Sequence, residues 1–284
     1  MTEMSGNKTN EQLKTEVGQF WSRASCGENL YLQGFSLHDY RNQMMERYRL
    51  EPYIPTFANA PTWKDKKVLE IGVGLGSDHQ LFAEAGAILS GIDYTERAIE
   101  HTKRRFALFN LQSELRRADT EDLPFSDDSF DLVYSWGVIH HSPNTRKAAR
   151  EILRVLKPGG TFKVMIYHKW SLVGLMLWLR YGLFTGRPFT SLDLLYAEHL
   201  ESPGTKAYTI EQAAELFSGA VDLTQTVILT HGDLLESAAG QRHQGHAIAV
   251  ARKIWPRWFF RRFAQRYGLF LLIEGRKPSG QALR

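Results

Sequence analysis

The chain has 284 residues, of which 43% are hydrophobic and 23% charged, a balance that excludes a disordered or fibrous protein. Its 35 Lys and Arg residues against 31 Asp and Glu give a net charge of +4, and the single cysteine, Cys26, excludes an internal disulfide. The polar start shows no signal core, and no apolar run reaches the roughly 20 residues that a membrane span needs. We therefore expect a soluble protein of a reducing, cytoplasmic compartment.

The predicted elements begin with a βαβ region in the middle of the chain. Short apolar runs alternate there with helical patterns, which predicts a mostly parallel sheet. The first strands are predicted over residues 67–73, 88–92, 132–135 and 161–167, the last of them after a stop signal at 157–160. Helical spacing predicts a helix that begins at Thr95 as N-cap, and a later helix with an apolar stripe from Ala148 to Leu156.

The remaining elements lie toward the end of the chain. Thr209 and Gln212 form a capping box that predicts a short helix, and strands follow over 221–230 and 268–273. Between these strands, the aromatics and arginines from Trp255 to Arg266 predict a basic amphipathic helix. Such a helix either packs its aromatic face on the sheet or lies on an anionic membrane, and we favour packing.

Two segments outside the alternation are rich in aromatic residues. Residues 20–57 contain eight aromatic side chains and residues 170–208 contain seven, well above the 12% of the whole chain. We expect both to be covers over a ligand site. The chain is therefore divided into an N-terminal cap at 1–60, a ligand-binding core at 61–168, an inserted lid at 169–208, and a completion of the sheet with the basic helix at 209–284.

The net charge differs between the two ends of the chain. Residues 252–284 carry a net charge of +8 and residues 1–251 one of −4. The acidic body argues against a surface that coats nucleic acid.

The most informative motif follows the first strand and contains Glu70 with glycines at 72, 74 and 76. Glycines at alternate positions allow a sharp turn and a close approach of a ligand to the backbone. A dinucleotide fingerprint would need a further glycine at 77 or 79, where the chain has Ser77 and His79. The motif therefore predicts a ligand without a pyrophosphate.

Acidic residues at the ends of the next strands suit a ligand that carries hydroxyl and amino groups. Asp93 ends the second strand, where a carboxylate can accept hydrogen bonds from both hydroxyls of a ribose. Asp119 follows the third strand and is a candidate acceptor for an adenine amino group. Glu70, beside the turn, would hold backbone or amino groups of the same ligand.

In this order the motifs resemble those of the class I S-adenosylmethionine-dependent methyltransferases, particularly the small-molecule branch related to ubiquinone- and menaquinone-biosynthesis enzymes. The resemblance covers residues 66–168 and rests on the glycine motif, Gly91-Ile-Asp93, Asp122-Leu-Pro-Phe125, Phe130-Asp-Leu-Val133, His140-His141 and Leu156-Lys-Pro-Gly-Gly160. It implies an α/β, Rossmann-like fold, with a seven-stranded mostly parallel sheet, one antiparallel strand near its edge, and helices on both faces. S-adenosylmethionine would be the cofactor, S-adenosylhomocysteine its product, and no metal is expected.

The resemblance and the positions at the sheet edge together give a set of site residues. Those expected at the cofactor are Glu70, Gly72, Gly74, Gly76, Asp93, Tyr94, Asp119, Thr120, Ser135 and Trp136. Those expected at the methyl acceptor are Tyr31, His141, His168 and Trp178. His140 and Tyr167 are the candidate catalytic residues, His140 as a base and Tyr167 as an orienting hydroxyl. The alternative for each histidine and for Tyr167 is a purely structural role.

The function expected is transfer of a methyl group to an O, N, S or C nucleophile of a small molecule. A dry, aromatic-lined pocket suits the sulfonium charge, and alignment of the reacting atoms supplies much of the rate. A nucleic-acid or protein methyltransferase is disfavoured because Ser135-Trp-Gly-Val138 stands where Asn/Asp-Pro-Pro-Tyr/Phe is usual. A non-catalytic cofactor-binding subunit is the other alternative. The acceptor and the oligomeric state are left open.

Overall fold

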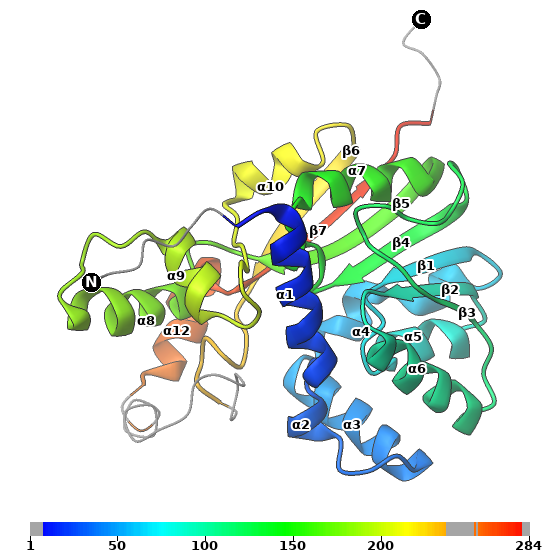
Figure 1. Ribbon diagram of the computed structural model, residues 1–284, viewed down its shortest axis with the longest axis horizontal. Coiled ribbons are helices and arrows are strands. Elements are labelled where there is room, and N and C mark those ends of the chain that lie inside the picture. Colours follow the sequence, from blue (N-terminus) through cyan, green and yellow to red (C-terminus); the bar gives the residue numbers. More distant parts are fainter. Residues whose placement is uncertain (1–7, 237–252, 254, 280–284) are drawn as a thin grey trace, which may run out of the picture.

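A computed structural model describes residues 8–236, 253 and 255–279 of the chain. Its centre is one seven-stranded sheet in the order β3-β2-β1-β4-β5-β7-β6 (Figure 1). The strands are β1 (Lys67–Ile71), β2 (Ile88–Asp93), β3 (Glu114–Arg117), β4 (Phe130–Trp136), β5 (Leu156–Tyr167), β6 (Val221–Ile228) and β7 (Phe270–Arg276). Strand β7 is antiparallel to both of its neighbours, and the other pairs are parallel. The predicted sheet is thus confirmed, including its antiparallel strand next to one edge.

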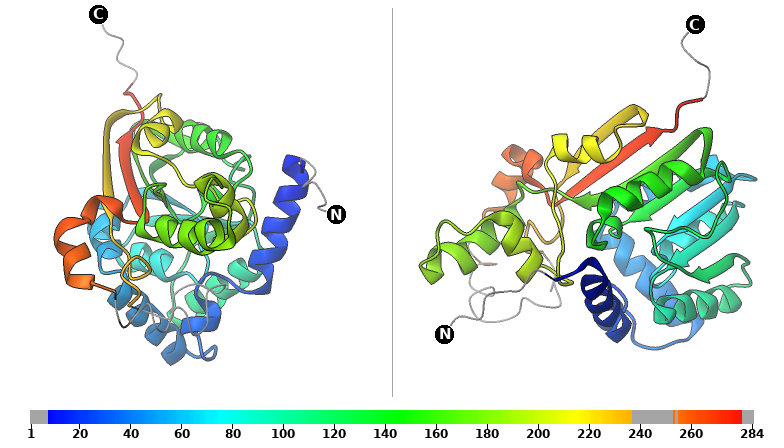
Figure 2. Two further views of the ribbon diagram at one scale, coloured as in Figure 1. Left: turned by 90° about the vertical axis from the view of Figure 1, so that its left-hand side faces the viewer. Right: turned by 45° about the horizontal axis from the view of Figure 1, so that its top comes forward.

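Helices cover both faces of the sheet (Figure 2). Val68 and Leu132 pair in register and pack with Phe82 of α5 (Ser77–Glu84), whereas the next pair, Leu69 and Val133, belongs to the cluster on the opposite face. Alternate residues of a strand point to opposite faces, so these central strands are apolar on both sides. The opposite face is covered by α7 (Thr145–Val155) and α10 (Ile210–Leu216).

The predicted helix starts are confirmed at two places. Thr95 caps α6 (Glu96–Leu108), and its hydroxyl oxygen accepts a hydrogen bond from the amide of Ala98 at 3.3 Å. Thr209 and Gln212 form the expected reciprocal capping box at the start of α10. In both cases a side-chain oxygen satisfies an amide of the first helical turn, which has no partner within the helix.

The two aromatic segments form helical layers at the carboxyl ends of the strands. The first contains α1 (Asn10–Arg23), α2 (Glu28–Tyr31), α3 (Leu37–Leu50), α4 (Tyr53–Ala58) and the short η1 (Ala60–Trp63). The second, which we call the lid, contains α8 (Leu172–Leu177), η3 (Trp178–Gly182), η4 (Leu183–Thr185) and α9 (Leu192–His199). Figure 1 shows α1 across the front of the sheet and the lid at the left-hand end. The divisions at 60, 168 and 208 remain predictions, and the first and last parts include residues outside the described ranges.

The arginine that joins the first layer to the core is fully buried. Arg105 of α6 donates through Nη1 to the carbonyl of Leu75 at 2.7 Å, to Ser77 Oγ at 2.8 Å and to Gln43 Oε1 of α3 at 3.0 Å. It also donates to the carbonyl of Tyr40. One side chain therefore fixes α3 against the glycine turn.

Two expectations are wrong. Residues 157–160 do not precede the strand but belong to it, because β5 begins at Leu156, which pairs with Phe130. The basic helix, α12 (Arg257–Phe263), does not pack an aromatic face on the sheet: none of its described residues is buried. It lies in the connection between β6 and β7, beyond the strand ends, where no sheet face is available.

Arg252 and Arg284 of the basic tail lie outside the described residues. Among those that are described, no helix is both long and apolar enough to cross a bilayer.

Candidate active site

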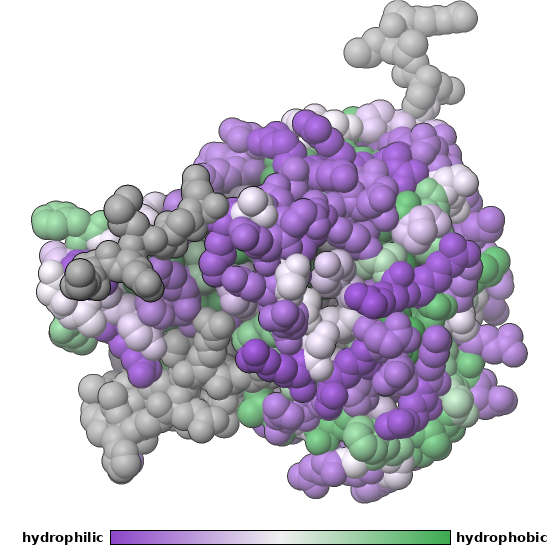
Figure 3. Space-filling model, viewed as in Figure 1, coloured by the Kyte–Doolittle hydropathy of each residue, from purple (hydrophilic) through white to green (hydrophobic). Residues whose placement is uncertain are grey.

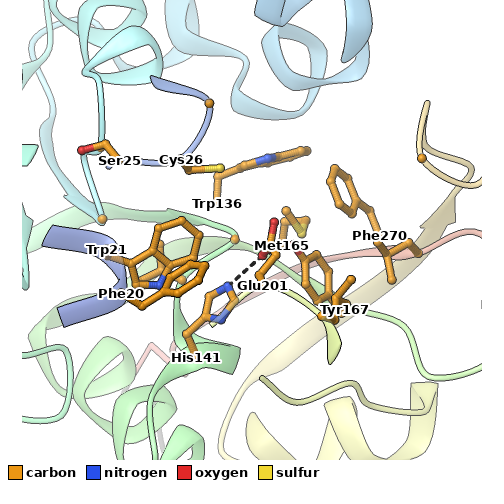
Figure 4. A pocket seen from close by; sticks show the side chains of 18 of the residues that line it. Phe20, Trp21, Ser25, Cys26, Trp136, His141, Met165, Tyr167, Glu201 and Phe270 are labelled. Carbon is orange, nitrogen blue, oxygen red and sulfur yellow. Dashed lines mark hydrogen bonds and ion pairs between the residues drawn. The ribbon is translucent and has the colours of Figure 1, made fainter. Parts of the chain in front are cut away.

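A cavity of about 680 Å³ lies at the carboxyl ends of the central strands. Its wall includes the glycine turn after β1, the end of β2, the loop after β4 and the lid. Open α/β sheets bind their ligands at this edge, because a crevice forms outside the carboxyl ends of the strands where the strand order reverses. The cavity has a polar end at the glycine turn and an aromatic end under the lid. Figure 4 shows the side chains of the aromatic end.

The glycine turn presents bare backbone to the polar end. Gly72 and Gly74 have φ values of 82° and 52°, a region that favours glycine. A Cβ at residue 72 would lie 2.1 Å from Val138 Cγ2, so a side chain there would collide with the loop after β4. At Gly74 nothing lies within 4 Å of such a Cβ, which leaves this stretch of backbone open to a ligand.

Asp93 lies beside the glycine turn at the polar end of the cavity. One carboxylate oxygen accepts from the amide of Gly74 at 3.2 Å, and the other accepts from the amide and the hydroxyl of Thr95 at 2.9 and 3.0 Å. Burial raises the pKa of this carboxyl above its ordinary value. The neighbouring Tyr94 lines the cavity and packs against α1, where a Cβ at Gly18 would be only 2.8 Å from its ring.

Asp119 and Thr120 also line the cavity, next to the first helix. Lys14 of α1 donates to Asp119 at 2.7 Å and forms an ion pair with Glu121 at 2.9 Å. The Thr120 hydroxyl is buried and has no hydrogen-bond partner among the described residues. A buried polar atom without a partner calls for a ligand or a water, so its position fits a polar group bound in this end of the cavity.

Glu70 and His79 form a buried pair behind the turn. His79 Nδ1 lies 2.8 Å from Glu70 Oε2, and its Nε2 lies 2.8 Å from the hydroxyl of Ser113. Burial raises the pKa of Glu70 well above its ordinary value and lowers that of His79 to about 3. Both shifts favour the uncharged forms, a protonated carboxyl and a neutral imidazole, which avoids two charges in the core.

A second charged group faces the cavity from α3. Arg47 donates through Nε and Nη2 to both oxygens of Asp78 at 3.2 and 2.9 Å, and its Nη1 lies 3.4 Å from Glu51. All three side chains line the cavity beside the glycine turn. Tyr134 completes the group by donating to Asp78 at 3.2 Å.

The aromatic end is built from several elements that come together under the lid (Figure 4). Trp136 of β4 and Phe270 of β7 meet edge to face at 5.7 Å, and Tyr167 of β5 stacks on Phe270 at 5.9 Å. Met165 adds a flexible apolar wall, and Trp21 comes from α1. Rings from strands and from the first helix thus enclose one space.

His141 stands at this end of the cavity and is held on both sides. Its Nδ1 lies 2.8 Å from Ser202 Oγ and 3.1 Å from Thr205 Oγ1, and its Nε2 lies 3.4 Å from Glu201 Oε2. Thr205 donates its own proton to the carbonyl of Ser202 at 2.6 Å, so its oxygen accepts from His141 and assigns the proton to Nδ1. The Nε2 lone pair is then the one that faces Glu201. Tyr167 donates to the same carboxylate oxygen at 2.6 Å.

The expected site residues divide into two groups. The cavity wall includes Glu70, Gly72, Gly74, Asp93, Tyr94, Asp119, Thr120, Trp136, Tyr31, His141 and Tyr167. Five others are not part of that wall: Gly76, Ser135, His140, His168 and Trp178.

Each of these five has a structural explanation. Gly76, with φ of 77°, is the N-cap of α5. The Nδ1 atom of His168 lies 3.2 Å from the carbonyl oxygen of Gly268. The indole of Trp178 donates to the carbonyl of Pro188 at 2.9 Å, inside the lid. Ser135 is fully buried in β4.

His140, the candidate base, is not part of the cavity wall. It is fully buried, and neither ring nitrogen has a hydrogen-bond partner among the described residues. Burial, with the neighbouring His141, lowers its pKa well below the ordinary value, so the ring stays neutral. It packs at 4.1 Å against the ring of Tyr167, behind the cavity wall, whereas its neighbour His141 belongs to that wall.

Three residues of the site were missed by the sequence analysis: Lys14, Arg47 and Glu201. They lie in the two covers, outside the motifs that carry the resemblance. Glu201 has a left-handed φ of 42° and begins a turn, Glu201-Ser-Pro-Gly-Thr205, whose composition predicts a turn but not a contact with His141. His140, His141 and Glu201 bring ligand-type atoms within 4.8 Å of one another, so the expected absence of a metal stays a prediction.

Comparison with known proteins assigns this part of the chain. A family model described as a methyltransferase domain matches residues 69–164. Residues 69–164 are thus similar to a methyltransferase domain. That domain runs from β1 to β5 and therefore supplies the glycine turn, Asp93, Thr120 and His141.

The relatives of the methyltransferase domain agree with this assignment. A Mycolicibacterium smegmatis protein named as an S-adenosylmethionine-dependent methyltransferase is 29% identical over 160 residues, 55% of this chain and 56% of that protein. The demethylmenaquinone methyltransferase of Clavibacter sepedonicus is 38% identical over 95 residues, 34% of this chain and 38% of that protein. The chain thus spans about half or less of the length of these curated relatives.

Solved structures extend the likeness of fold beyond the methyltransferase domain. The crystal structure of the [4+2]-cyclase SpnF is similar over 81% of both chains, with a TM-score of 0.54 and 20% identity. At this identity the likeness concerns the fold alone. The name of that structure also illustrates that one fold can serve several chemistries.

Proposed function

We propose that the protein transfers a methyl group from S-adenosylmethionine to a nucleophile of a small, largely apolar molecule. The observation that carries this proposal is the continuity of one cavity. It joins a bare glycine turn and Asp93 at one end with aromatic walls and the His141–Glu201 pair at the other. When bound, S-adenosylmethionine supplies an electrophilic methyl group on a positively charged sulfur.

The polar end has the groups that such a cofactor needs. Asp93 keeps lone pairs for hydroxyl donors beyond its bonds to Gly74 and Thr95. The hydroxyl of Thr120, which has no hydrogen-bond partner among the described residues, fits a polar edge of the adenine ring of the cofactor. Arg47 lines the cavity beside the turn and, although it is paired with Asp78 and Glu51, places a positive charge near a carboxylate bound there. Asp119 is already bound to Lys14, so that α1 takes part in closing this end.

The aromatic end favours the reaction by excluding water and by accommodating the cation. The π-faces of Trp136 and Tyr167 attract positive charge, and this attraction is strongest when the site is dry. The apolar walls also orient an apolar acceptor, so that much of the acceleration comes from alignment. These walls, rather than a set of hydrogen bonds, select the acceptor in this proposal.

His141 would act when the acceptor arrives with a proton on its nucleophilic atom. The contacts to Ser202 and Thr205 keep the ring proton on Nδ1. The Nε2 atom can then take the proton of a hydroxyl or an amine. The carboxylate of Glu201, 3.4 Å away, then stabilises the imidazolium. The acceptor gains the methyl group and loses that proton, which leaves the product neutral.

Two alternative functions would use the same cavity, and the reaction product distinguishes them from methyl transfer. A binding subunit would hold the cofactor without turnover, and a different reaction on this fold would give a product without the label. We expect that incubation of the protein and a cell extract with trideuteromethyl-labelled cofactor yields a small molecule in which a labelled methyl group replaces a hydrogen, detected by mass spectrometry. An unlabelled extract, with the cofactor bound but unconsumed, would overturn the proposal.

A further inference from the structure

Aromatic side chains stand out into solvent at the end of the molecule that carries the lid. Trp258 of α12 is 70% exposed, and Phe184 and Phe189 of the lid are 78% and 99% exposed. Figure 3 shows hydrophobic side chains at this end of the molecule, as well as at the lower right of the same face. We call the exposed rings of this end the aromatic–basic patch, with the arginines beside them; its rings are Phe184, Phe189, Trp258, Phe259 and Phe263.

The charge beside these rings is predominantly positive, and one of the arginines, Arg261, is paired with Glu236. Residues 253–267 contain five basic side chains and no acid, and residues 170–192 contain two arginines and no acid. Arg262 lies 5.3 Å from the ring of Phe263, so that cations and rings share one surface. Exposed rings with an excess of positive charge beside them are the pattern of an element that lies in the interface of an anionic membrane.

The patch is continuous with the aromatic end of the cavity. Phe184 and Arg180 of the lid belong to the cavity wall, as does Trp255, which immediately precedes α12. The indole of Trp255 donates to the carbonyl of Asp233 at 2.9 Å and fixes the start of this helix against the body. A molecule that enters between the lid and α12 therefore meets apolar side chains from the surface to the active site.

We propose that the aromatic–basic patch docks the protein on the surface of an anionic lipid bilayer, and that the methyl acceptor is a membrane-dissolved amphiphile. The rings enter the level of the headgroups, and the arginines bind lipid phosphates. The docking stands on the patch alone, whereas the nature of the acceptor rests on the proposed function. A bilayer is favoured over a protein partner because the patch combines an excess of positive charge with exposed rings, which need no complementary groove in a bilayer.

Sedimentation of the full chain with lipid vesicles tests the docking without any turnover. We expect binding to vesicles of phosphatidylcholine with phosphatidylglycerol, weak binding to phosphatidylcholine alone, and release by salt. Arg261→Gln with Arg262→Gln should weaken binding at least tenfold, since each cation near the surface contributes about fivefold. Trp258→Ser with Phe263→Ser should cause a comparable loss.

The control substitutions remove an exposed apolar side chain and an exposed arginine outside the patch. Ile88 and Arg116 lie in β2 and β3, outside the patch, and Ile88→Ser with Arg116→Gln should leave vesicle binding unchanged. Equal binding of wild type and patch variants, or no preference for anionic vesicles, would overturn the proposal. So would patch variants that only dissolve an oligomer in gel filtration. Binding of S-adenosylhomocysteine, measured separately, distinguishes a failure of docking from a failure of the proposed function.

Discussion

Tyr167 and His141 meet at one carboxylate oxygen: the phenol donates to Glu201 Oε2 at 2.6 Å, and His141 Nε2 lies 3.4 Å from the same atom. The three side chains come from β5, from the loop after β4 and from the turn after α9. Burial, with Glu201, raises the pKa of the Tyr167 phenol well above its ordinary value. Tyr167 therefore stays a hydrogen-bond donor that holds Glu201 toward His141.

The first prediction concerns this group. For an acceptor that carries a proton on its nucleophile, His141→Ala should lower kcat roughly 10²–10⁴-fold, because the proton then has no nearby base. Glu201→Gln should lower kcat less, since the base remains while its charged partner is lost. Steady-state kinetics with saturating cofactor measure both effects.

The matched control is the adjacent histidine. His140 lies behind the wall without hydrogen-bond partners among the described residues, so His140→Phe should keep kcat within a few-fold of wild type. A large loss of kcat in His140→Phe together with normal kcat in His141→Ala would return the catalytic role to His140.

The second prediction concerns the anchor between α3 and the glycine turn. Arg105→Met should lower the free energy of unfolding by roughly 2–4 kcal/mol, because buried acceptors on Leu75, Gln43 and Tyr40 lose their donor. Lys103→Met, two residues away and exposed, should change it by no more than about 0.5 kcal/mol. Denaturant unfolding compares the two, and equal stability of both variants would contradict the account.

The sequence predicted the sheet well because parallel strands buried on both faces leave long apolar runs between glycine and helix signals. It predicted Gly72 and Asp93 for the same reason, since strand ends fix their place at the edge. It did not decide which of the adjacent His140 and His141 faces the cavity, because that depends on the local helical turn at Ile139–His141. It missed Glu201 because a contact across 60 residues leaves no local signal. It also assigned α12 to the sheet, although the same aromatic pattern serves an exposed helix.

The third prediction is a dependence of stability on pH. Burial raises the pKa of Glu51 to about 7 from an ordinary 4.5, although Arg47 opposes the shift. The folded state thus binds this proton more tightly than the unfolded chain, so the contribution is complete below pH 4.5 and is lost as the pH rises through 7. Relative to Glu51→Gln, wild type should lose up to about 3 kcal/mol of unfolding free energy over this range. A difference that does not change with pH would contradict the assignment.

The fourth prediction separates backbone strain from collision at the glycine turn. Gly72→Ala should weaken both the fold and cofactor binding, because its φ is 82° and the new Cβ would lie 2.1 Å from Val138 Cγ2. Adding Val138→Ala removes the two Cγ contacts, although the Cβ of residue 138 stays 3.2 Å from the new one. The double variant should therefore recover part of the stability, with about 1–2 kcal/mol of strain remaining from the left-handed backbone. Thermal unfolding of the single and double variants measures this; no recovery in the double variant would mean that the turn itself moves.

Calorimetric titration with S-adenosylhomocysteine tests the central claim most directly. Wild type should bind it and should not bind NAD, because the turn lacks the third glycine of the phosphate fingerprint. Asp93→Ala should lower the affinity by at least about tenfold, since hydrogen bonds to a charged group contribute roughly 1.5–3 kcal/mol each. Asp222→Ala, an exposed acid paired with Arg276, should bind as wild type does. Binding of NAD without S-adenosylhomocysteine, or an affinity that Asp93→Ala leaves unchanged, would contradict the account.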